Sequence, residues 1–299
     1  MVALNPTWHK LVIGDSKLMR EVKDETVHLV VTSPPYWQLK DYGTMNQIGQ
    51  SNKTYNEYLE MLSDVFNECV RVLTPDGKLC INIMPIFLSG NGSKFKRRVT
   101  KIVLTDIDLI MEKTERMYLH SLYIWDKRKV ARFSSYGSYP YPPNVFSTFP
   151  YEWIMVFAKA GKRPSVSKEI KKLSKIQHED WENWCVNSLW EMQPASATKE
   201  KHPAPFPEEL PRRIIKLHSF VGDTVLDPFL GSGTTMKVAR DLGRNSIGFE
   251  INPEYLSVIK QKVEWGKQTL ERASAKVQYE LVIRERTQEE MAVCPIDSA

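Results

Sequence analysis

The segment from Asp223 to Glu250 constrains the fold of this chain more than any other. An apolar run at residues 223–226 is followed by a turn with two glycines, a stretch with helical spacing as far as Leu242, and a second apolar run at residues 245–249. A strand, a tight turn, a helix and another strand in this order are typical of a parallel sheet with helices packed on its faces. The segment therefore predicts an α/β fold.

Short apolar runs alternate with helical patterns over most of the remaining chain. They predict further strands at residues 9–13, 27–32, 78–84, 121–125 and 153–158, and helices at 55–72 and from 252 to about 267. Residues 278–284 also alternate like a strand, although the sequence does not place this strand in the sheet.

The turn after Leu226 has the features of a ligand-binding loop. It reads Asp227-Pro228-Phe229-Leu230-Gly231-Ser232-Gly233-Thr234-Thr235. Its two glycines let the backbone approach a ligand closely, and the helix behind them begins with free N–H groups. Glu250 ends the next strand, 23 residues after Asp227, where a carboxylate can hold the hydroxyls of a ribose. An ordinary strand-to-helix turn is the alternative.

A second turn, Ser33-Pro34-Pro35-Tyr36, follows the strand predicted at residues 27–32. Two prolines cannot extend a sheet, so the chain turns here in a stiff shape that presents the Ser33 hydroxyl, the Pro34 carbonyl and the Tyr36 ring. This suits chemistry on the amino group of a base, whose lone pair is delocalised into the ring. Two preorganised acceptors for its hydrogens localise that lone pair, and an aromatic ring stacks on a base that has left the helix.

Both turns, in this order, resemble motifs of the amino-methylating DNA methyltransferases, in the beta-type arrangement with the catalytic motif first and the cofactor motif late. Asp-Pro-Phe-x-Gly-Ser-Gly-Thr-Thr resembles the S-adenosylmethionine-binding motif, and residues 202–211 resemble the segment that closes over the methionine moiety. The resemblance spans roughly residues 11–262. It implies a Rossmann-like S-adenosylmethionine-dependent methyltransferase fold with a mixed, mostly parallel sheet and a small inserted recognition region, and double-stranded DNA as the partner.

The resemblance also assigns roles to single residues. Ser33 Oγ and the Pro34 carbonyl would accept hydrogen bonds from the target amino group, Pro35 would stiffen the turn, and Tyr36 would stack on the base. Asp227 would contact the methionine end of the cofactor, Glu250 the ribose, and Asp15 the adenine amino group, with a turn-forming role as the alternative for Asp15. The full set expected to bind S-adenosylmethionine is Asp15, Pro203, Phe206, Asp227, Pro228, Phe229, Gly231, Ser232, Gly233, Thr234 and Glu250.

Serine at position 33 resembles the cytosine-N4 branch of these restriction-modification enzymes, whereas adenine-N6 enzymes more often carry aspartate there. We predict a site-specific cytosine-N4 DNA methyltransferase that flips the base and transfers the methyl group directly, with adenine N6 as the alternative. Methylation of cytosine carbon 5 needs a cysteine nucleophile, and none of Cys69, Cys80, Cys185 and Cys294 stands in a Pro-Cys turn after a strand. A catalytically silent nucleic-acid-binding protein and an RNA methyltransferase are alternatives of other classes.

Residues 160–211 interrupt the α/β pattern, since they are polar, broken by prolines and carry three tryptophans. We expect an insertion there and not a continuation of the sheet. The predicted organisation is a catalytic half at residues 1–160, a target-recognition region at 161–200 by family analogy, and a cofactor-binding half of the same domain at 201–267. Residues 268–299 are expected to form a C-terminal extension with a frayed end.

The positive charge of the chain is concentrated in one region. Residues 86–132 contain eleven Lys and Arg against five Asp and Glu, whereas the whole chain carries a net charge of +5. Such a region is the usual electrostatic footprint for a polyanion, with a solvated face as the alternative. We predict phosphate contacts for two groups of cations: Lys94, Lys96, Arg97 and Arg98, and Lys127, Arg128, Lys129 and Arg132.

The four cysteines are far apart and form no C-x-x-C pair, which indicates neither a zinc site nor a disulfide framework, and we predict no metal. No apolar run is long enough to span a membrane. We therefore expect a cytoplasmic protein, associated with the nucleoid of a prokaryote-like cell. The resemblance implies a cognate restriction endonuclease that acts separately, and the sequence does not give the oligomeric state.

Overall fold

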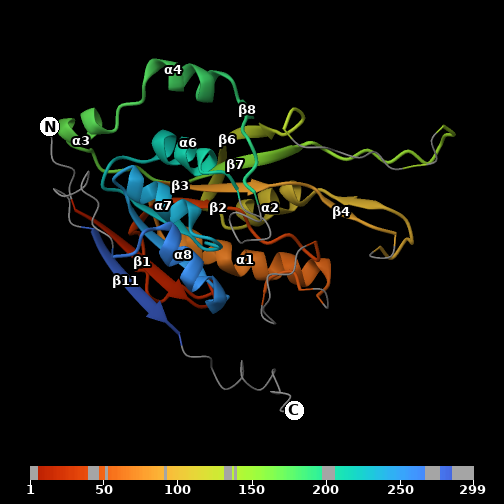
Figure 1. Cartoon of the computed structure of the whole chain (residues 1–299), viewed down its shortest axis with the longest axis horizontal. Helices are drawn as coiled ribbons and strands as arrows, with labels where there is room; N and C mark the ends of the chain where they lie inside the picture. Colours follow the sequence, from red (N-terminus) through yellow and green to blue (C-terminus); the bar gives the residue numbers. More distant parts are fainter. Residues whose placement is uncertain are drawn as a thin grey trace, which may run out of the picture.

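A nine-stranded sheet runs through the centre of the molecule. The computed structural model describes residues 6–39, 47–50, 53–90, 93–130, 137, 140–196, 206–266 and 277–284. The strand order is β11-β1-β10-β9-β2-β3-β7-β6-β8, and among these strands only β7 runs against its neighbours. Helices cover both faces (Figure 1). The predicted α/β fold with a mixed, mostly parallel sheet is confirmed.

The strands and helices that were predicted lie close to their predicted positions, and the structure has further strands and helices that were not predicted. The strands of the sheet are β1 (Thr7–Ile13), β2 (Val27–Thr32), β3 (Leu73–Ile83), β6 (Met117–Asp126), β7 (Tyr151–Lys159), β8 (Leu189–Glu191), β9 (Thr224–Asp227), β10 (Asn245–Glu250) and β11 (Val277–Ile283). The helices are α1 (Tyr55–Val72), α2 (Val103–Glu112), α3 (Lys168–Leu173), α4 (His178–Trp181), the π-helical turn η1 (Glu182–Val186), α6 (Glu209–His218), α7 (Thr234–Asp241), the 3-10 turn η2 (Pro253–Tyr255) and α8 (Leu256–Lys262). Two short strands, β4 (Ile86–Leu88) and β5 (Val99–Lys101), pair with each other as an arm outside the main sheet (Figure 1).

Strand β2 shows why helices cover both faces of the sheet. Leu29 and Val31 are buried on the face covered by α6 and α7, whereas Val30 is buried on the face covered by α1 and α2. Alternate side chains of a strand point to opposite faces, so a strand that is apolar at every position needs a layer on each side. Helix α1 has the predicted bounds and starts with a capping box, in which Thr54 and Glu57 exchange side-chain and backbone hydrogen bonds.

The inserted segment contributes a strand to the sheet, and the expectation that it lies wholly outside is wrong. Strand β8 pairs with the end of β6, with Trp190 opposite Trp125. Trp190 is fully buried, and its ring stacks on Tyr123 with a centroid distance of 4.5 Å. Burial of this large ring fixes the segment at the sheet edge, and the local sequence pattern could not show it because the partner strand lies far away in the chain.

Several predicted boundaries also differ from the structure. Strand β3 begins at Leu73, before the predicted start at residue 78, and Asp76, with a positive φ of 62°, lies where the pairing of β3 with β2 is irregular. The helix predicted from Asn252 begins as the 3-10 turn η2, and α8 ends at Lys262. Neither change moves the residues proposed for the site.

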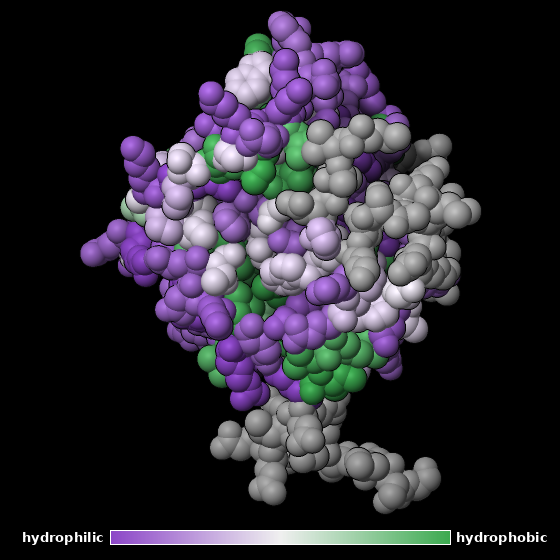
Figure 2. Space-filling view, turned by 90° about the vertical axis from the view of Figure 1, so that its left-hand side faces the viewer, coloured by the Kyte–Doolittle hydropathy of each residue, from purple (hydrophilic) through white to green (hydrophobic). Residues whose placement is uncertain are grey.

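Strand β11 forms the other edge of the sheet, parallel to β1 from Thr7 opposite Val277 to Ile13 opposite Ile283. The face of the molecule in Figure 2 is mostly hydrophilic, and its apolar patches are small. Within the part of the chain that the structure describes, no helix has both the length and the apolar character needed to cross a membrane.

Candidate active site

One cavity opens where the carboxyl ends of β1, β2, β9 and β10 meet. Parallel strands end at the same edge of a sheet, and open α/β sheets bind their ligands there. Its empty volume, open mouth included, is about 860 Å³.

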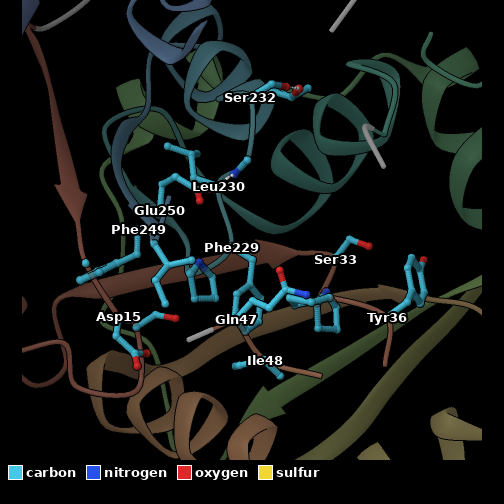
Figure 3. A pocket seen from close by; sticks show the side chains of 18 of the residues that line it. Asp15, Ser33, Tyr36, Gln47, Ile48, Phe229, Leu230, Ser232, Phe249 and Glu250 are labelled. Atoms are coloured by element: carbon cyan, nitrogen blue, oxygen red, sulfur yellow. Dashed lines mark hydrogen bonds between the residues drawn. The ribbon is translucent and has the colours of Figure 1, made fainter. Parts of the chain in front are cut away.

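The cavity brings together most of the residues proposed from sequence. Its predicted members are Asp15, Ser33, Pro34, Pro35, Tyr36, Phe206, Pro228, Phe229, Gly231, Ser232, Thr234 and Glu250. Asp15 and Glu250 lie at one end, Ser33 and Tyr36 at the other, and Phe229 between them (Figure 3). Asp227 and Gly233 do not line it, and Pro203 lies outside the described residues. The two motifs, almost 200 residues apart, therefore face one space.

Both glycines of the cofactor loop adopt conformations that other residues rarely reach. Gly231 has a φ of 55° and Gly233 a φ of 91°, and Gly233 is the N-cap of α7. A third glycine, Gly248 of β10, makes the loop fit, because a Cβ there would lie 2.5 Å from the side chain of Leu230. The loop consequently packs directly on β10, and Glu250 lies beside it.

Glu250 is a buried carboxylate held by the backbone of this loop. Its Oε2 accepts a hydrogen bond from Gly231 N and its Oε1 one from Asn252 N, both at 2.8 Å. Burial raises the pKa of Glu250 to about 7, although these two hydrogen bonds act in the opposite direction. A carboxylate with a pKa near neutrality at a cavity wall is typical of a ligand-binding position.

Asp227 lies behind the cavity wall and connects the two motifs. Its Oδ1 accepts from Thr32 Oγ1 at 2.8 Å and from Phe229 N at 3.1 Å, and its Oδ2 accepts from Thr235 Oγ1 at 2.6 Å. It is 1% exposed, and burial raises its pKa to about 6. Thr32 directly precedes Ser33, so one side chain ties the base of the catalytic turn to the cofactor loop.

The catalytic turn is fixed from the side of α1. Tyr58 donates a hydrogen bond from its hydroxyl to the Pro35 carbonyl at 3.0 Å. Trp37 donates from Nε1 to the Lys53 carbonyl at 2.9 Å, and Gln38 N donates to the Gly49 carbonyl at 2.9 Å. Tyr58 thus holds the Pro35 carbonyl, while Ser33 and Pro34 line the cavity.

Several residues that line the cavity were not predicted from the sequence. They are Gly14, Ser16, Gln47, Ile48, Leu230, Phe249 and Ile251. Most of them adjoin a predicted residue in the chain, so reading whole strand ends would have found them. Gln47 and Ile48 belong to a connecting loop that carries no recognisable motif, and only the tertiary structure brings them here.

Arg284, just after β11, holds the loop that contains Asp15. Its guanidinium donates to the carbonyl groups of Asp15 at 2.6 Å and Leu18 at 2.5 Å, and forms an ion pair with Glu21. The residues after the second half of the domain therefore shape the cofactor end of the cavity. Sequence reasoning assigned them no role because the contact needs β11 beside β1.

We expect Arg284→Ala to weaken binding of S-adenosylhomocysteine about tenfold, because the loop loses several charge-assisted hydrogen bonds. Isothermal calorimetry measures the effect. Arg20→Ala is the matched control, since Arg20 belongs to the same loop and its side chain is 64% exposed. Equal losses in the two variants would contradict the anchoring role of Arg284.

The two predicted groups of cations have different surroundings. Lys94, Lys96, Arg97 and Arg98 are exposed in the loop that joins β4 to β5. In the second group each described cation meets a carboxylate: Lys127 pairs with Glu152, Arg128 with Asp126 at 2.8 Å, and Lys129 with Glu191 at 2.7 Å. Arg132 lies outside the described residues. The ends of β6 and β8 and the start of β7 bring these opposite charges together, so the second group carries little uncompensated charge.

The described cysteines lie away from the cavity. Cys69 and Cys80 are buried in the core, and burial raises their pKa values well above the usual range of a thiol. Cys185 is part of η1 and does not line the cavity. No described thiol therefore lines the cavity.

The chain is similar to known DNA methyltransferases. A family model described as DNA methylase matches residues 27–261. The type II methyltransferase M.MjaI of Methanocaldococcus jannaschii is 34% identical over 285 residues, which cover 86% of this chain and 91% of that protein. The type II methyltransferase M.SmaI of Serratia marcescens is 32% identical, over 85% of this chain and 90% of that protein.

Solved structures also resemble the chain. The putative DNA modification methylase TTHA0409 of Thermus thermophilus, in complex with S-adenosyl-L-methionine, is 28% identical with a TM-score of 0.71, and the match covers 93% of this chain and 100% of that one. The cytosine-N4-specific PvuII DNA methyltransferase is 20% identical with a TM-score of 0.63, over 92% and 97% of the two chains, and shares the fold.

Proposed function

Because the chain belongs to the DNA methylase family, and is therefore a type II DNA amino-methyltransferase that uses S-adenosylmethionine, we propose that it methylates the N4 amino group of cytosine in duplex DNA. The predicted methyltransferase fold, cofactor and restriction-modification type of family are confirmed. The choice of cytosine rests on Ser33, where adenine-N6 enzymes more often carry aspartate. Adenine N6 is the second candidate.

One observation carries the proposal: the turn of Ser33 to Tyr36 and the loop around Gly231 line a single cavity. A base that enters beside Tyr36 would therefore meet the cofactor without any larger movement of the sheet. The DNA duplex has to release the base for this, as in other enzymes that modify bases.

The cavity suits S-adenosylmethionine at the end that holds Asp15 and Glu250. Phe229 and Phe249 provide apolar walls, and the start of α7 provides N–H groups. We assign Glu250 to the ribose hydroxyls, Asp15 to the adenine amino group and the loop of residues 228–234 to the methionine end. The bound cofactor supplies an electrophilic methyl group on its sulfonium.

At the other end, the chain prepares the base amino group for attack. Ser33 Oγ and the Pro34 carbonyl accept hydrogen bonds from the two N–H groups of the base, which localises the nitrogen lone pair toward the cofactor. Tyr36 stacks on the base ring, and Tyr58 keeps the turn in place through the Pro35 carbonyl. No residue of the turn forms a covalent bond with the base. The amino nitrogen would take the methyl group directly as the carbon–sulfur bond breaks, S-adenosylhomocysteine would leave, and the methylated amino group would release one proton to solvent.

The experiment that tests this proposal is mass spectrometry of nucleosides from DNA incubated with the protein and S-adenosylmethionine. The expected product is N4-methylcytosine. N6-methyladenine would favour the second candidate, and 5-methylcytosine would contradict amino methylation. Competition between duplex DNA and RNA in a tritium-transfer assay distinguishes the RNA methyltransferase, and binding of cofactor without any product would favour the catalytically silent protein.

We expect Tyr36→Ala to lower the rate of methyl transfer about 10- to 100-fold, because a stacked base loses its platform. Binding of S-adenosylhomocysteine should change little, since Tyr36 lies at the far end of the cavity (Figure 3). Tyr36→Phe keeps the ring and should retain most of the rate. Equal losses of transfer and of cofactor binding in Tyr36→Ala would contradict the stacking role.

The pKa of Glu250 near 7 gives a pH dependence. Below this pKa the carboxyl is protonated and accepts hydrogen bonds poorly, so we expect S-adenosylhomocysteine to bind about tenfold more weakly at pH 6 than at pH 8. The stability of the ligand-free protein should change with pH in the opposite sense. Its raised pKa stabilises the fold below the ordinary value of 4.5, and this contribution is lost as the pH rises to about 7.

Isothermal calorimetry at pH 6 and pH 8 measures the affinity. Thermal unfolding of the ligand-free protein between pH 4.5 and about 7 measures the stability. Glu250→Gln cannot ionise, so its affinity should be weak and nearly independent of pH between 6 and 8. A wild-type affinity that stays constant over the same range would exclude Glu250 as the ribose ligand.

We also propose that the chain divides into segments that end at residues 160, 200 and 267, and that the region at 161–200 recognises the DNA sequence. Its partner is a restriction endonuclease that acts separately. Phosphate contact is proposed for Lys94, Lys96, Arg97 and Arg98, whereas we now assign Lys127, Arg128 and Lys129 mainly to the ion pairs at the sheet edge. A cytoplasmic, nucleoid-associated location follows from the DNA substrate.

A further inference from the structure

A second hollow adjoins the catalytic turn, between α1 and the arm formed by β4 and β5. It has an empty volume of about 1020 Å³ and is open to solvent. We call it the arm groove and define it by six of its lining residues, three aromatic and three basic: Trp37, Tyr55, Phe95, Lys53, Lys94 and Lys101. None of these residues takes part in the cofactor cavity.

The aromatic side chains give the arm groove a fixed floor and an exposed rim. Trp37 is fixed by its hydrogen bond to the Lys53 carbonyl, and its ring lies 5.1 Å from that of Tyr55. Tyr55 donates a hydrogen bond from its hydroxyl to Asp106 at 2.5 Å. Burial, together with the charge of Asp106, holds the pKa of Tyr55 far above its usual value, so Tyr55 stays a neutral phenol. Phe95 on the arm is 64% exposed, so its ring is accessible to a ligand.

The charges of the arm groove suit an anion. Lys101 places its ammonium 4.5 Å from the centre of the Tyr55 ring, and Lys94 places its own 5.1 Å from that of Phe95. Two carboxylates lie nearby: Asp106 accepts the hydrogen bond from Tyr55, and Glu57 pairs with Lys53 at 3.5 Å, so the lining cations that remain for a ligand are Lys94 and Lys101. Aromatic rings beside lysines are the usual means by which proteins hold single-stranded nucleic acid, with rings for the bases and cations for the phosphates.

The arm groove and the cofactor cavity share the catalytic turn. Tyr36 lines the cavity, and the next residue, Trp37, lines the groove. Gly49 keeps these two residues close to the adjoining loop, because a Cβ at Gly49 would lie 2.9 Å from the Cα of Trp37. A DNA strand that delivers one base to Tyr36 therefore has its neighbouring nucleotides within reach of the groove.

We propose that the arm groove is a nucleotide-binding subsite that holds the DNA strand next to the flipped target base. Phe95 and Tyr55 contact bases, and Lys94 and Lys101 contact phosphates. The subsite rests on the proposed function in that its ligand is the target strand, but it does not depend on whether cytosine or adenine is methylated. It would keep the target strand apart from its complement while the base is in the cavity.

The test is fluorescence anisotropy of a short fluorescein-labelled strand of thymidylate, titrated with the full chain in the presence of S-adenosylhomocysteine. Phe95→Ala should weaken binding about 5- to 100-fold, and Phe95→Tyr, which keeps the ring, should restore most of it. Lys94→Gln and Lys101→Gln should each lower the slope of log affinity against log salt by about 0.7. Lys23→Gln is the matched control, because Lys23 precedes the amino end of β2, whereas the arm groove adjoins the turn that follows the carboxyl end of β2.

Strand binding in Phe95→Ala and Lys101→Gln equal to that of the wild type, with cofactor affinity intact, would overturn the subsite. Ser33→Ala separates this outcome from a failure of the proposed function, since it should lose methyl transfer and keep strand binding. As a second measurement, ultraviolet crosslinking to a strand that carries 5-bromodeoxyuridine should label peptides that contain Phe95 or Tyr55. Crosslinks confined to other peptides would also count against the subsite.

Discussion

Ser33→Ala is expected to lower the rate of methyl transfer at saturating substrates about 100- to 1,000-fold. The hydroxyl is one of only two proposed acceptors for the amino hydrogens, and removal of one preorganised partner of a reacting group has effects of this size. The substitution removes one oxygen from the cavity wall and leaves Thr32 and its bond to Asp227 in place. Affinity for S-adenosylhomocysteine should therefore stay within about twofold.

Single-turnover assays with labelled cofactor measure this loss, and calorimetry measures the affinity. Ser16→Ala is the matched control, because Ser16 is a buried serine that lines the same cavity beside Asp15. Its rate at saturating cofactor should remain near that of the wild type. Retention of the full rate by Ser33→Ala would remove the hydroxyl from the mechanism and weaken the argument for cytosine.

Asp227→Ala should lower the affinity for the cofactor by about 100-fold and the free energy of unfolding by about 2–4 kcal/mol. The carboxylate accepts hydrogen bonds from Thr32, Thr235 and Phe229 N, and alanine would leave these buried donors unpaired. The cofactor loop and the catalytic turn would then lose their common support. Calorimetry and denaturant unfolding measure the two losses.

Asp227→Asn separates a supporting role from direct contact with the cofactor. Asparagine keeps Oδ1 as the acceptor for Thr32 and Phe229 N, and its Nδ2 can donate to the Thr235 hydroxyl, so a supporting residue should retain most of the affinity. If the charge itself bound the cofactor, asparagine would be as damaging as alanine. Unchanged affinity in Asp227→Ala would exclude both roles.

The two motifs could be predicted from the sequence because their chemistry is local. The turn Ser33-Pro34-Pro35-Tyr36 after a strand has few conformations open to it, and Gly231 and Gly233 adopt positive φ values that glycine reaches easily. Helix α1 has the predicted bounds because its capping box and apolar stripe are both written within the segment itself. In each case the residues that set the local conformation lie within about one turn or one strand of it in the sequence.

Contacts between distant segments could not be predicted in this way. The stacking of Trp190 on Tyr123 brings β8 into the sheet, and Arg284 reaches the loop of Asp15 only because β11 pairs with β1. The basic region had the expected sign of charge, but its second half is neutralised by carboxylates from β6, β7 and β8. Pairing between strands follows from packing over the whole chain, which no local pattern encodes.

Local sequence was enough to predict the kind of fold and most of the side chains that the structure brings to the cavity, because strand, turn and helix preferences and the stiffness of two prolines act over short distances. How those side chains combine depends on the packed chain. Packing made Asp227 a buried link between two motifs, raised the pKa of Glu250 to about 7 by burial, and set Trp37 beside a second groove. The physical reason is that the burial of a side chain, its electrostatic environment and the shape of a cavity are set only when segments far apart in sequence pack together.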